Sequence, residues 1–134
     1  MRYLLDTNVI SDLIRNPGGT AAQRAHSLGA EALCTSIIVA AELRYGVTRS
    51  GSLRLAERVE EALRALSVLP FAAPADAHYA RIRDRLARQG RLIGTNDMLI
   101  AAHTLALGYT IVTDNVAEFA RIEGLRHQNW RTTQ

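Results

Sequence analysis

The sequence predicts an α/β protein, a three-layer α/β/α sandwich with a small, mostly parallel central sheet. Short apolar runs alternate along the chain with longer segments in which apolar residues recur at helical spacing. Most of these runs lie too far apart to form hairpins, so parallel pairing through right-handed crossovers is expected. The 134 residues, 48% of them apolar, suffice for a real core, and we expect residues 1–134 to form a single domain.

The first part of the chain predicts a strand followed by two short helices. Residues 2–5 form an apolar run that ends at Asp6, and apolar residues then recur at helical spacing as far as Asn16. The sequence Asn-Pro-Gly-Gly at 16–19 stops this helix. A second helix is expected over 20–28, because Gly29 follows as a helix terminator.

The middle of the chain predicts a second strand and two further helices. The strand is expected over 32–35, and an unusually apolar helix is expected over 37–46. Residues 52–67 carry leucine and valine on one face and pairs of arginine and glutamate on the other. This pattern is typical of an amphipathic surface helix.

The last part of the chain predicts two strands and two helices. A strand over 68–71 precedes a helix that Pro74 opens and that runs to Gly90. Another helix is expected over 96–107, and the β-branched run 109–113 predicts the last strand.

Composition limits where the protein acts. An acid at position 6 interrupts the apolar stretch that a signal peptide needs, so export is not expected. The longest uncharged run, 98–113, is shorter than the roughly 20 residues that span a bilayer. The lone Cys34 lies among small residues, which favours packing in a reducing cytosol. We therefore expect a cytoplasmic protein without a membrane partner.

All sixteen basic residues are arginine, and the formal net charge is +3. The absence of lysine excludes a P-loop lysine and a Schiff-base lysine. Arginine offers planar, bidentate donors that suit phosphate, so a polyanionic partner is plausible, although base composition of the gene could also cause this bias.

Four acids lie in otherwise apolar or small-residue segments, each where a strand ends or a helix begins. They are Asp6, Glu42, Asp97 and Asp114. Each alone has an ordinary explanation, such as a helix start, a turn or a core ion pair. Together they are costly, because carboxylates taken out of water repel one another, and a bound divalent cation is the simplest compensation. In parallel sheets ligands bind beyond the carboxyl ends of the strands, where Asp6 and Asp114 are expected.

Four segments in order resemble the PIN-domain ribonucleases, and within them the VapC toxins of bacterial toxin–antitoxin pairs. Residues 4–10 are similar to the opening motif of that family, and residues 38–46 to its second motif. Residues 93–103 and 111–119 resemble its third and fourth motifs, and the ending over 122–130 is also typical. The resemblance covers nearly the whole chain and implies a PIN-like fold.

The resemblance implies a metal-dependent endoribonuclease that uses Mg²⁺, for which Mn²⁺ can substitute. Asp6, Glu42 and Asp97 are carried over as the metal-binding acids. Many relatives place the last acid one residue after Asp114, so Asp114 or Asn115 is expected to fill that position. The chemistry favours hard oxygen ligands and a metal-activated water, with one ion or two left open. Five residues are expected to support the acids or a water: Thr7, Asn8, Ser36, Thr113 and Asn115.

The substrate and the remaining polar residues are less defined. Arg81, Arg85 and Arg88 share one helical face and could contact RNA phosphates, although the same pattern suits a solvated face. His103 is six positions beyond Asp97 and should point away from it, which favours a packing role. Since the few aromatic residues are scattered, selectivity is expected to come from the shape of a folded RNA such as tRNA.

The family also implies partners. Similar toxins form homodimers and are inhibited by a VapB-type antitoxin, whose tail occupies the acidic groove and which can bring the complex to operator DNA. We expect the helices between residues 20 and 67 to present much of the antitoxin groove, because small residues there allow close approach. The residues in question are Ala21, Ala22, Ala56 and Ala62.

Three alternatives to a nuclease can be compared with the sequence. A phosphatase of the haloacid dehalogenase type needs a second aspartate where this chain has Asn8, and a signalling receiver domain needs a lysine. A degenerate PIN fold that only binds a partner would not need the acids at positions 6, 42 and 97.

Overall fold

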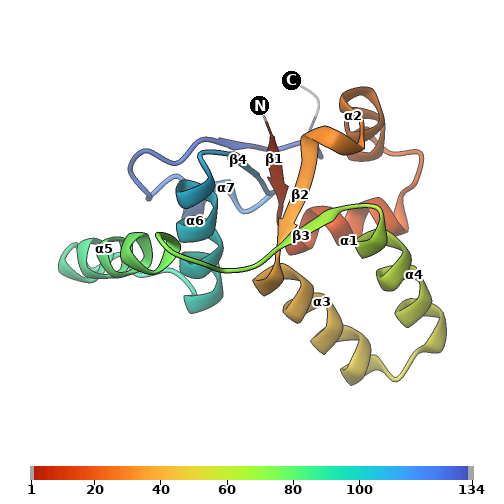
Figure 1. The fold of residues 1–134 in the computed structure, drawn as a ribbon, viewed down its shortest axis with the longest axis horizontal. Helices are drawn as coiled ribbons and strands as arrows, with labels where there is room; N and C mark the ends of the chain where they lie inside the picture. The colour runs from red at the N-terminus through yellow and green to blue at the C-terminus, as the bar shows by residue number, and fades with distance from the viewer. Residues whose placement is uncertain (1, 133–134) are drawn as a thin grey trace.

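The structure, a computed structural model, describes residues 2–132 and contains a five-stranded sheet between two layers of helices (Figure 1). Every pair of neighbouring strands is parallel, in the order β3-β2-β1-β4-β5. The strands are β1 (Tyr3–Leu5), β2 (Leu33–Ser36), β3 (Ser67–Leu69), β4 (Thr110–Val112) and β5 (His127–Gln128). The predicted α/β/α class is confirmed, and the sheet is parallel throughout the described chain rather than mostly so.

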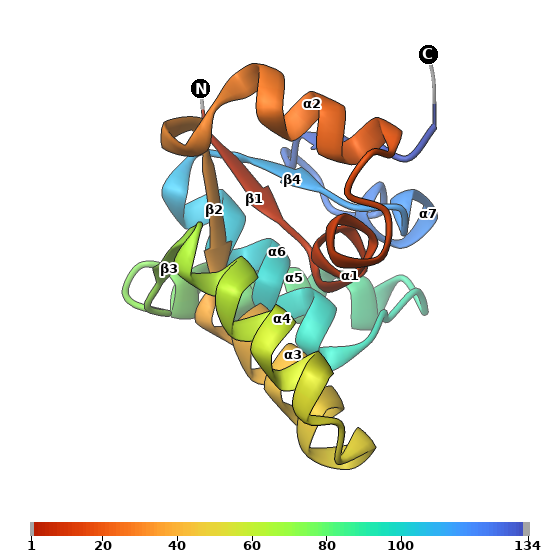
Figure 2. The same ribbon diagram turned by 90° about the vertical axis from the view of Figure 1, so that its right-hand side faces the viewer.

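The helices cover both faces of the sheet, as Figures 1 and 2 show from two directions. Helices α1, α2 and α4 lie on one side and α5 and α6 on the other, while α3 extends below the sheet beside α4. Their bounds are α1 (Thr7–Arg15), α2 (Thr20–Leu28), α3 (Ile37–Ser50), α4 (Leu53–Arg64), α5 (Ala75–Arg88), α6 (Thr95–Leu107) and α7 (Val116–Phe119).

Side-chain caps set where three of these helices begin. Asp6 accepts a hydrogen bond from the backbone of Thr7, Ser36 from that of Ile38, and Ser52 from that of Leu55. Helix α3 continues four residues past Gly46, where the sequence predicted its end, and stops at Gly51, whose φ is 67°. A mid-helix glycine costs only about 1 kcal/mol, so it need not end a helix.

Three short elements were not predicted. They are the 3₁₀ turn Ala30–Ala32, helix α7 and strand β5. Each has four residues or fewer, which is too short for a periodic pattern, and β5 consists of two polar residues.

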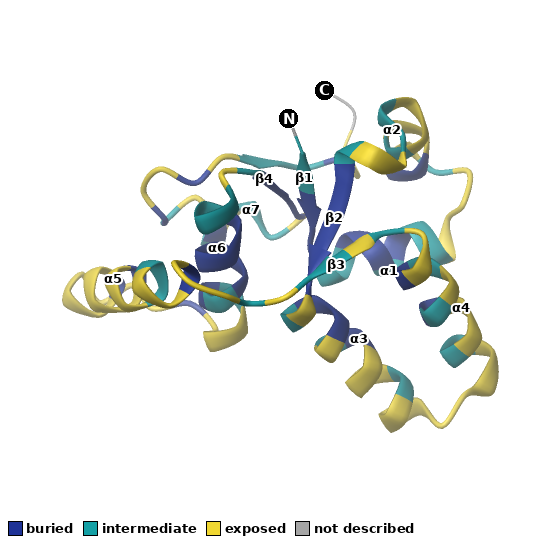
Figure 3. Cartoon of the chain, viewed as in Figure 1, coloured by how far each residue is buried: buried dark blue, intermediate teal, exposed yellow. Residues whose placement is uncertain are grey.

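The core lies around the middle strands and α6 (Figure 3). Leu4, Leu5, Ile111 and Val112 are fully buried in β1 and β4. Cys34 is also fully buried, which raises the pKa of its thiol to about 11, in line with the predicted packing role. None of the helices in the described part of the chain combines the length and apolar character that a membrane span requires.

Candidate active site

Strands β1 and β4 run side by side, so the residues that follow them meet at the same edge of the sheet. Asp6 continues the ladder by donating its backbone N–H to the carbonyl of Val112 at 2.9 Å. Its carboxylate is only 3% exposed and accepts hydrogen bonds on both oxygens. Thr7 N–H donates to Oδ1 at 2.8 Å, and Thr113 Oγ1 and Asn8 Nδ2 donate to Oδ2 at 2.8 and 3.2 Å. These bonds hold the carboxylate in one orientation.

Glu42 reaches the same place from α3. Thr7 Oγ1 donates to Glu42 Oε1 at 2.9 Å, so Thr7 contacts both acids, one through its backbone and one through its side chain. No ion pair within residues 2–132 includes Glu42, and the neighbouring Arg44 pairs with Glu60 instead. A buried glutamate with a purely structural role would need an arginine partner. Among residues 2–132, Glu42 has no such ion pair.

Asp97 lies in the first turn of α6 beside Gly94. Burial, the negative charges of Asp6, Glu118 and Glu42, and a hydrogen bond with Glu118 together raise the pKa of Asp97 to about 7. Burial also raises the pKa of Asp6, against the hydrogen bonds that favour its charged form. Asp97 on α6 thus lies among three other carboxylates, which come from the residue after β1, from α3 and from α7, and their charges disfavour its ionised form.

Glu118 is the site residue that sequence reasoning missed. It belongs to the predicted fourth motif, and it is the only charge in residues 116–120. The four-residue helix α7 brings it to the Asp97 carboxyl group. Its position shortly after the last predicted strand could have indicated a role in the site. Residues that follow β4 emerge at the same edge of the sheet as Asp6, which follows β1.

The structure places Asp114 at the rim. Its carboxylate pairs with Arg131, and its backbone N–H donates to Asn8 Oδ1 at 3.2 Å. Asn115 donates its backbone N–H to Thr113 Oγ1 at 3.0 Å. The acids that raise the pKa of Asp97 are Asp6, Glu118 and Glu42, so the electrostatic cluster forms without Asp114.

Three of the predicted supporting residues, Thr7, Asn8 and Thr113, contact the acids directly. Ser36 does something else: its Oγ caps α3 and shares a 2.8 Å hydrogen bond with His103 Nδ1. His103 is buried edge-on to Phe71, and this burial lowers its pKa. The expected packing role of His103 agrees with these contacts.

The donor chemistry of the cluster fits a hard divalent cation. All four groups offer carboxylate oxygens, and their mutual repulsion is what a cation would relieve. Within residues 2–132, however, no three His, Cys, Asp or Glu side chains stand close enough to enclose a metal ion. This arrangement suits Mg²⁺ or Mn²⁺, since Mg²⁺ keeps several waters and needs only one or two carboxylates.

The predicted arginine face lies on α5 and is exposed. Arg85 pairs with Glu123, and Arg88 pairs with Asp84 at 2.9 Å. Arg81 Nη2 contacts His78 Nδ1 at 3.4 Å. Helix α5 packs against α6, the helix that carries Asp97.

The sequence of this chain is similar to those of known ribonucleases. Residues 3–125 match the PIN domain family. The chain is 36% identical to ribonuclease VapC2 of Haemophilus influenzae and 36% identical to the tRNA(fMet)-specific endonuclease VapC of Shigella flexneri. Each alignment covers 97% of this chain and 98% of the relative.

Solved structures agree with this comparison. The crystal structure of DNA-bound VapBC from Salmonella typhimurium contains a chain with a TM-score of 0.89 and 35% identity. The alignment covers 97% of this chain and 98% of that one. VapBC2 from Rickettsia felis, bound to a fragment of its promoter, gives a TM-score of 0.87 at 35% identity, over 97% and 99% of the two chains.

Proposed function

Because the chain belongs to the PIN-domain family and, within it, to the VapC ribonucleases of VapBC toxin–antitoxin systems, we propose that it hydrolyses RNA as the toxin of such a pair. The observation that carries the proposal is the convergence of Asp6, Glu42, Asp97 and Glu118 at the carboxyl ends of β1 and β4. Repulsion between neighbouring carboxylates lowers the stability of a protein. Clusters of such perturbed groups are therefore found mostly at functional sites.

We propose that Asp6 and Asp97 are the principal metal ligands, with Glu42 and Glu118 beside them. When bound, Mg²⁺ or Mn²⁺ activates water for attack on phosphorus and stabilises charge on the leaving oxygen. The protein's part is orientation. Thr113 and Asn8 fix the Asp6 carboxylate, and Thr7 fixes it relative to Glu42. Direct ligation by Asp114 or Asn115 stays a prediction.

A folded RNA is the proposed substrate, and tRNA is the class to test first. The Shigella flexneri relative is a tRNA(fMet)-specific endonuclease at 36% identity over nearly its full length. Few aromatic residues are present, so recognition by base stacking has little support.

The deciding experiment incubates the antitoxin-free protein with total tRNA and Mg²⁺ or Mn²⁺. Asp97→Asn and a chelator serve as negative controls, and Asp76→Asn, an exposed aspartate outside the cluster, serves as the matched substitution. Discrete fragments that vanish only with Asp97→Asn and the chelator would support the proposal. Metal binding without any cleavage of tRNA or ribosomal RNA would contradict it, and absence of both would favour the degenerate binding module.

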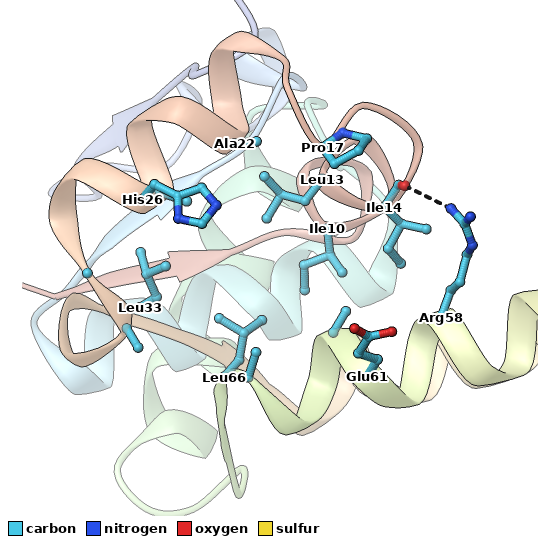
Figure 4. A pocket seen from close by; sticks show the side chains of 15 residues that line it. Ile10, Leu13, Ile14, Pro17, Ala22, His26, Leu33, Arg58, Glu61 and Leu66 are labelled. Atoms are coloured by element: carbon cyan, nitrogen blue, oxygen red, sulfur yellow. Dashed lines mark hydrogen bonds between the residues drawn. The ribbon is translucent and has the colours of Figure 1, made fainter.

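The partner proposal rests on a groove of about 590 Å³ between α1, α2 and α4 (Figure 4). Its walls are mainly apolar, with Arg58 and Glu61 at the rim and His26 on α2. We propose that an amphipathic helix of a VapB-type antitoxin lies in this groove. The proposed groove is lined by α1, through Ile10, Leu13 and Ile14, as well as by α2 and α4, and not by α3, so it overlaps only in part with the helices between residues 20 and 67 that the sequence favours.

Two alanines on α4 provide a matched test of this groove. Ala62 lines it, whereas Ala56, one of the other small residues singled out from the sequence, does not. Ala62→Glu should weaken antitoxin binding, measured by calorimetry, much more than Ala56→Glu does. Equal losses, or no change in hydrogen exchange of α1, α2 and α4 on antitoxin binding, would remove the groove from consideration. The homodimer and the antitoxin-dependent contact with operator DNA remain predictions for the same preparation.

A further inference from the structure

A small basic pocket lies between α5, the end of α6 and the segment that follows α7. Its volume is about 200 Å³. Buried apolar side chains, Ile82 and Leu86 among them, form its inner wall. Polar groups at its mouth come from two separate parts of the chain: His78, Arg81 and Arg85 on α5, and Arg121 and Glu123 beyond α7. The outer face of α5 is exposed along its length (Figure 3).

The charges at this mouth are only partly neutralised. Arg85 pairs with Glu123. Arg81 contacts an imidazole nitrogen of His78, and Arg121 donates Nη1 to the backbone carbonyls of Arg91 and Leu92 at 3.2 and 3.5 Å. Neither Arg81 nor Arg121 takes part in an ion pair among residues 2–132. Since a guanidinium has five donors, both keep donors free for an anion.

The charge distribution of the whole chain favours basic sites outside the acidic cluster for an RNA enzyme. Once Asp6, Glu42, Asp97 and Glu118 are set apart, sixteen arginines face only nine acidic residues. The four clustered carboxylates repel phosphate before any cation binds. Attraction of a polyanion must therefore come from basic groups that flank the cluster.

The pocket lies within reach of the acids. Leu105, which lines it, follows Asp97 by eight residues on α6, about 12 Å along the helix axis. That length corresponds to roughly three or four base steps along one strand of a duplex. Arg121 follows Glu118 by three residues and binds the backbone that leads into Gly94 and Asp97, so the two sites share a border.

From these observations we propose that the pocket binds a backbone phosphate of the RNA a few nucleotides from the bond that is cut. Arg81 and Arg121 contact that phosphate, and the Arg85–Glu123 pair holds the two segments together around it. Arg88 shares the same helical face but pairs with Asp84 and lies outside the pocket. The proposal rests on the proposed ribonuclease function and adds to it the path that the RNA takes from the site.

The test measures binding rather than cleavage. A fluorescently labelled tRNA(fMet) transcript is titrated in chelator with the Asp97→Asn protein, at several salt concentrations. In the Asp97→Asn protein, the further substitutions Arg81→Gln and Arg121→Gln should together weaken RNA binding. They should also reduce the slope of log affinity against log salt concentration by about one. The matched control, Arg24→Gln with Arg54→Gln, removes the same charge from α2 and α4, and its slope should stay close to that of the parent.

If both pairs of substitutions changed the RNA affinity and its salt dependence equally, only the net charge of the protein would matter. That result would reject the pocket as a phosphate site. Because Arg121 also holds backbone, Arg81→Gln alone must weaken binding as well, and an unchanged affinity for that exposed variant counts against the proposal. Cleavage by the wild-type protein is assayed in parallel with Mg²⁺. Cleavage with no effect of the variants would reject the pocket and keep the nuclease, whereas neither binding nor cleavage by the wild type would reject both.

Discussion

Asp97 is the residue at which stability and function oppose each other. The pKa of an unfolded aspartate is about 3.8, whereas burial and the charge of Asp6 raise the pKa of Asp97 in the folded protein to about 7. Between these values the folded state holds more protons, so this group makes the free energy of unfolding fall as pH rises through that window. Above about pH 7 the full penalty of an uncompensated carboxylate is present.

Asp97→Asn should therefore stabilise the metal-free protein at pH 8 while abolishing cleavage. The amide carries no charge and can still donate to Glu118. We expect a gain of about 1–2 kcal/mol, since water partly screens this incompletely buried group, and almost none at pH 4. Urea unfolding in chelator at both pH values measures it. The exposed Asp76→Asn is the control, and a variant that lost stability at pH 8 would contradict the electrostatic account.

Glu118 and Asp114 compete for the place of the fourth acid. Glu118→Gln should lower cleavage and Mn²⁺ affinity by roughly 10–100-fold, as the loss of a metal-supporting group does. Asp114→Asn should lower cleavage and Mn²⁺ affinity much less, because the Asp114 carboxylate forms an ion pair with Arg131. Cleavage rates and calorimetric Mn²⁺ titrations of the two variants decide the matter. The reverse order of effects would restore Asp114 to the site.

The contrast between these acids shows what sequence can and cannot reveal about a site. Asp6, Glu42 and Asp97 were predictable because each is the lone charge in an apolar or small-residue segment. Glu118 is also the lone charge of residues 116–120, but its place beside Asp97 depends on how the chain folds after β4. Ser36 was expected near the carboxylates, and its hydrogen bonds to the α3 backbone and to His103 depend on tertiary contacts that no local pattern records.

At the scale of elements, Arg131 joins the end of the chain to α1. It approaches the buried Asp12 at 3.4 Å and also pairs with Asp114, which follows β4. Asn16 Nδ2 donates a further bond to Asp12 Oδ1 at 2.7 Å. One arginine thus links three segments that meet only in the folded protein.

Arg131→Gln should destabilise the protein by about 1–3 kcal/mol, because it leaves the buried charge of Asp12 without a cation. Adding Asp12→Asn should recover much of that loss, since the uncompensated charge disappears. A double-mutant cycle by urea unfolding measures the coupling. Simple additivity of the two substitutions would show that the pair is energetically irrelevant.

The ends of the helices with nine residues or more were predicted to within a few residues. Apolar residues that recur at helical spacing over two turns or more indicate a helix clearly. Strand positions were also close, but their order in the sheet was not available from the sequence. That order depends on which face of the sheet each connecting helix covers. Several different orders would bury these short apolar strands equally well. The two-residue β5 exists only because the main chain of β4 is there to pair with it.

At the scale of the whole molecule, cation binding should be visible as pH-dependent stability. Mn²⁺ should raise the melting temperature more at pH 8 than at pH 5.5, because protonation of Asp97 at the lower pH competes with the ion. Differential scanning fluorimetry with and without Mn²⁺ gives the shift at each pH. Asp97→Asn should remove most of it, and an equal shift at both pH values would place the ion elsewhere.

The strand order also has a consequence for synthesis on the ribosome. The first strand to emerge, β1, sits at the centre of the sheet, and one of its two partners, β4, begins only at Thr110. Glu118 and Arg131 come later still. A nascent chain therefore holds Asp6 without Thr113, which orients its carboxylate, until β4 has been translated. The carboxylates of the site therefore come together only after the strands on both sides of β1 have been made.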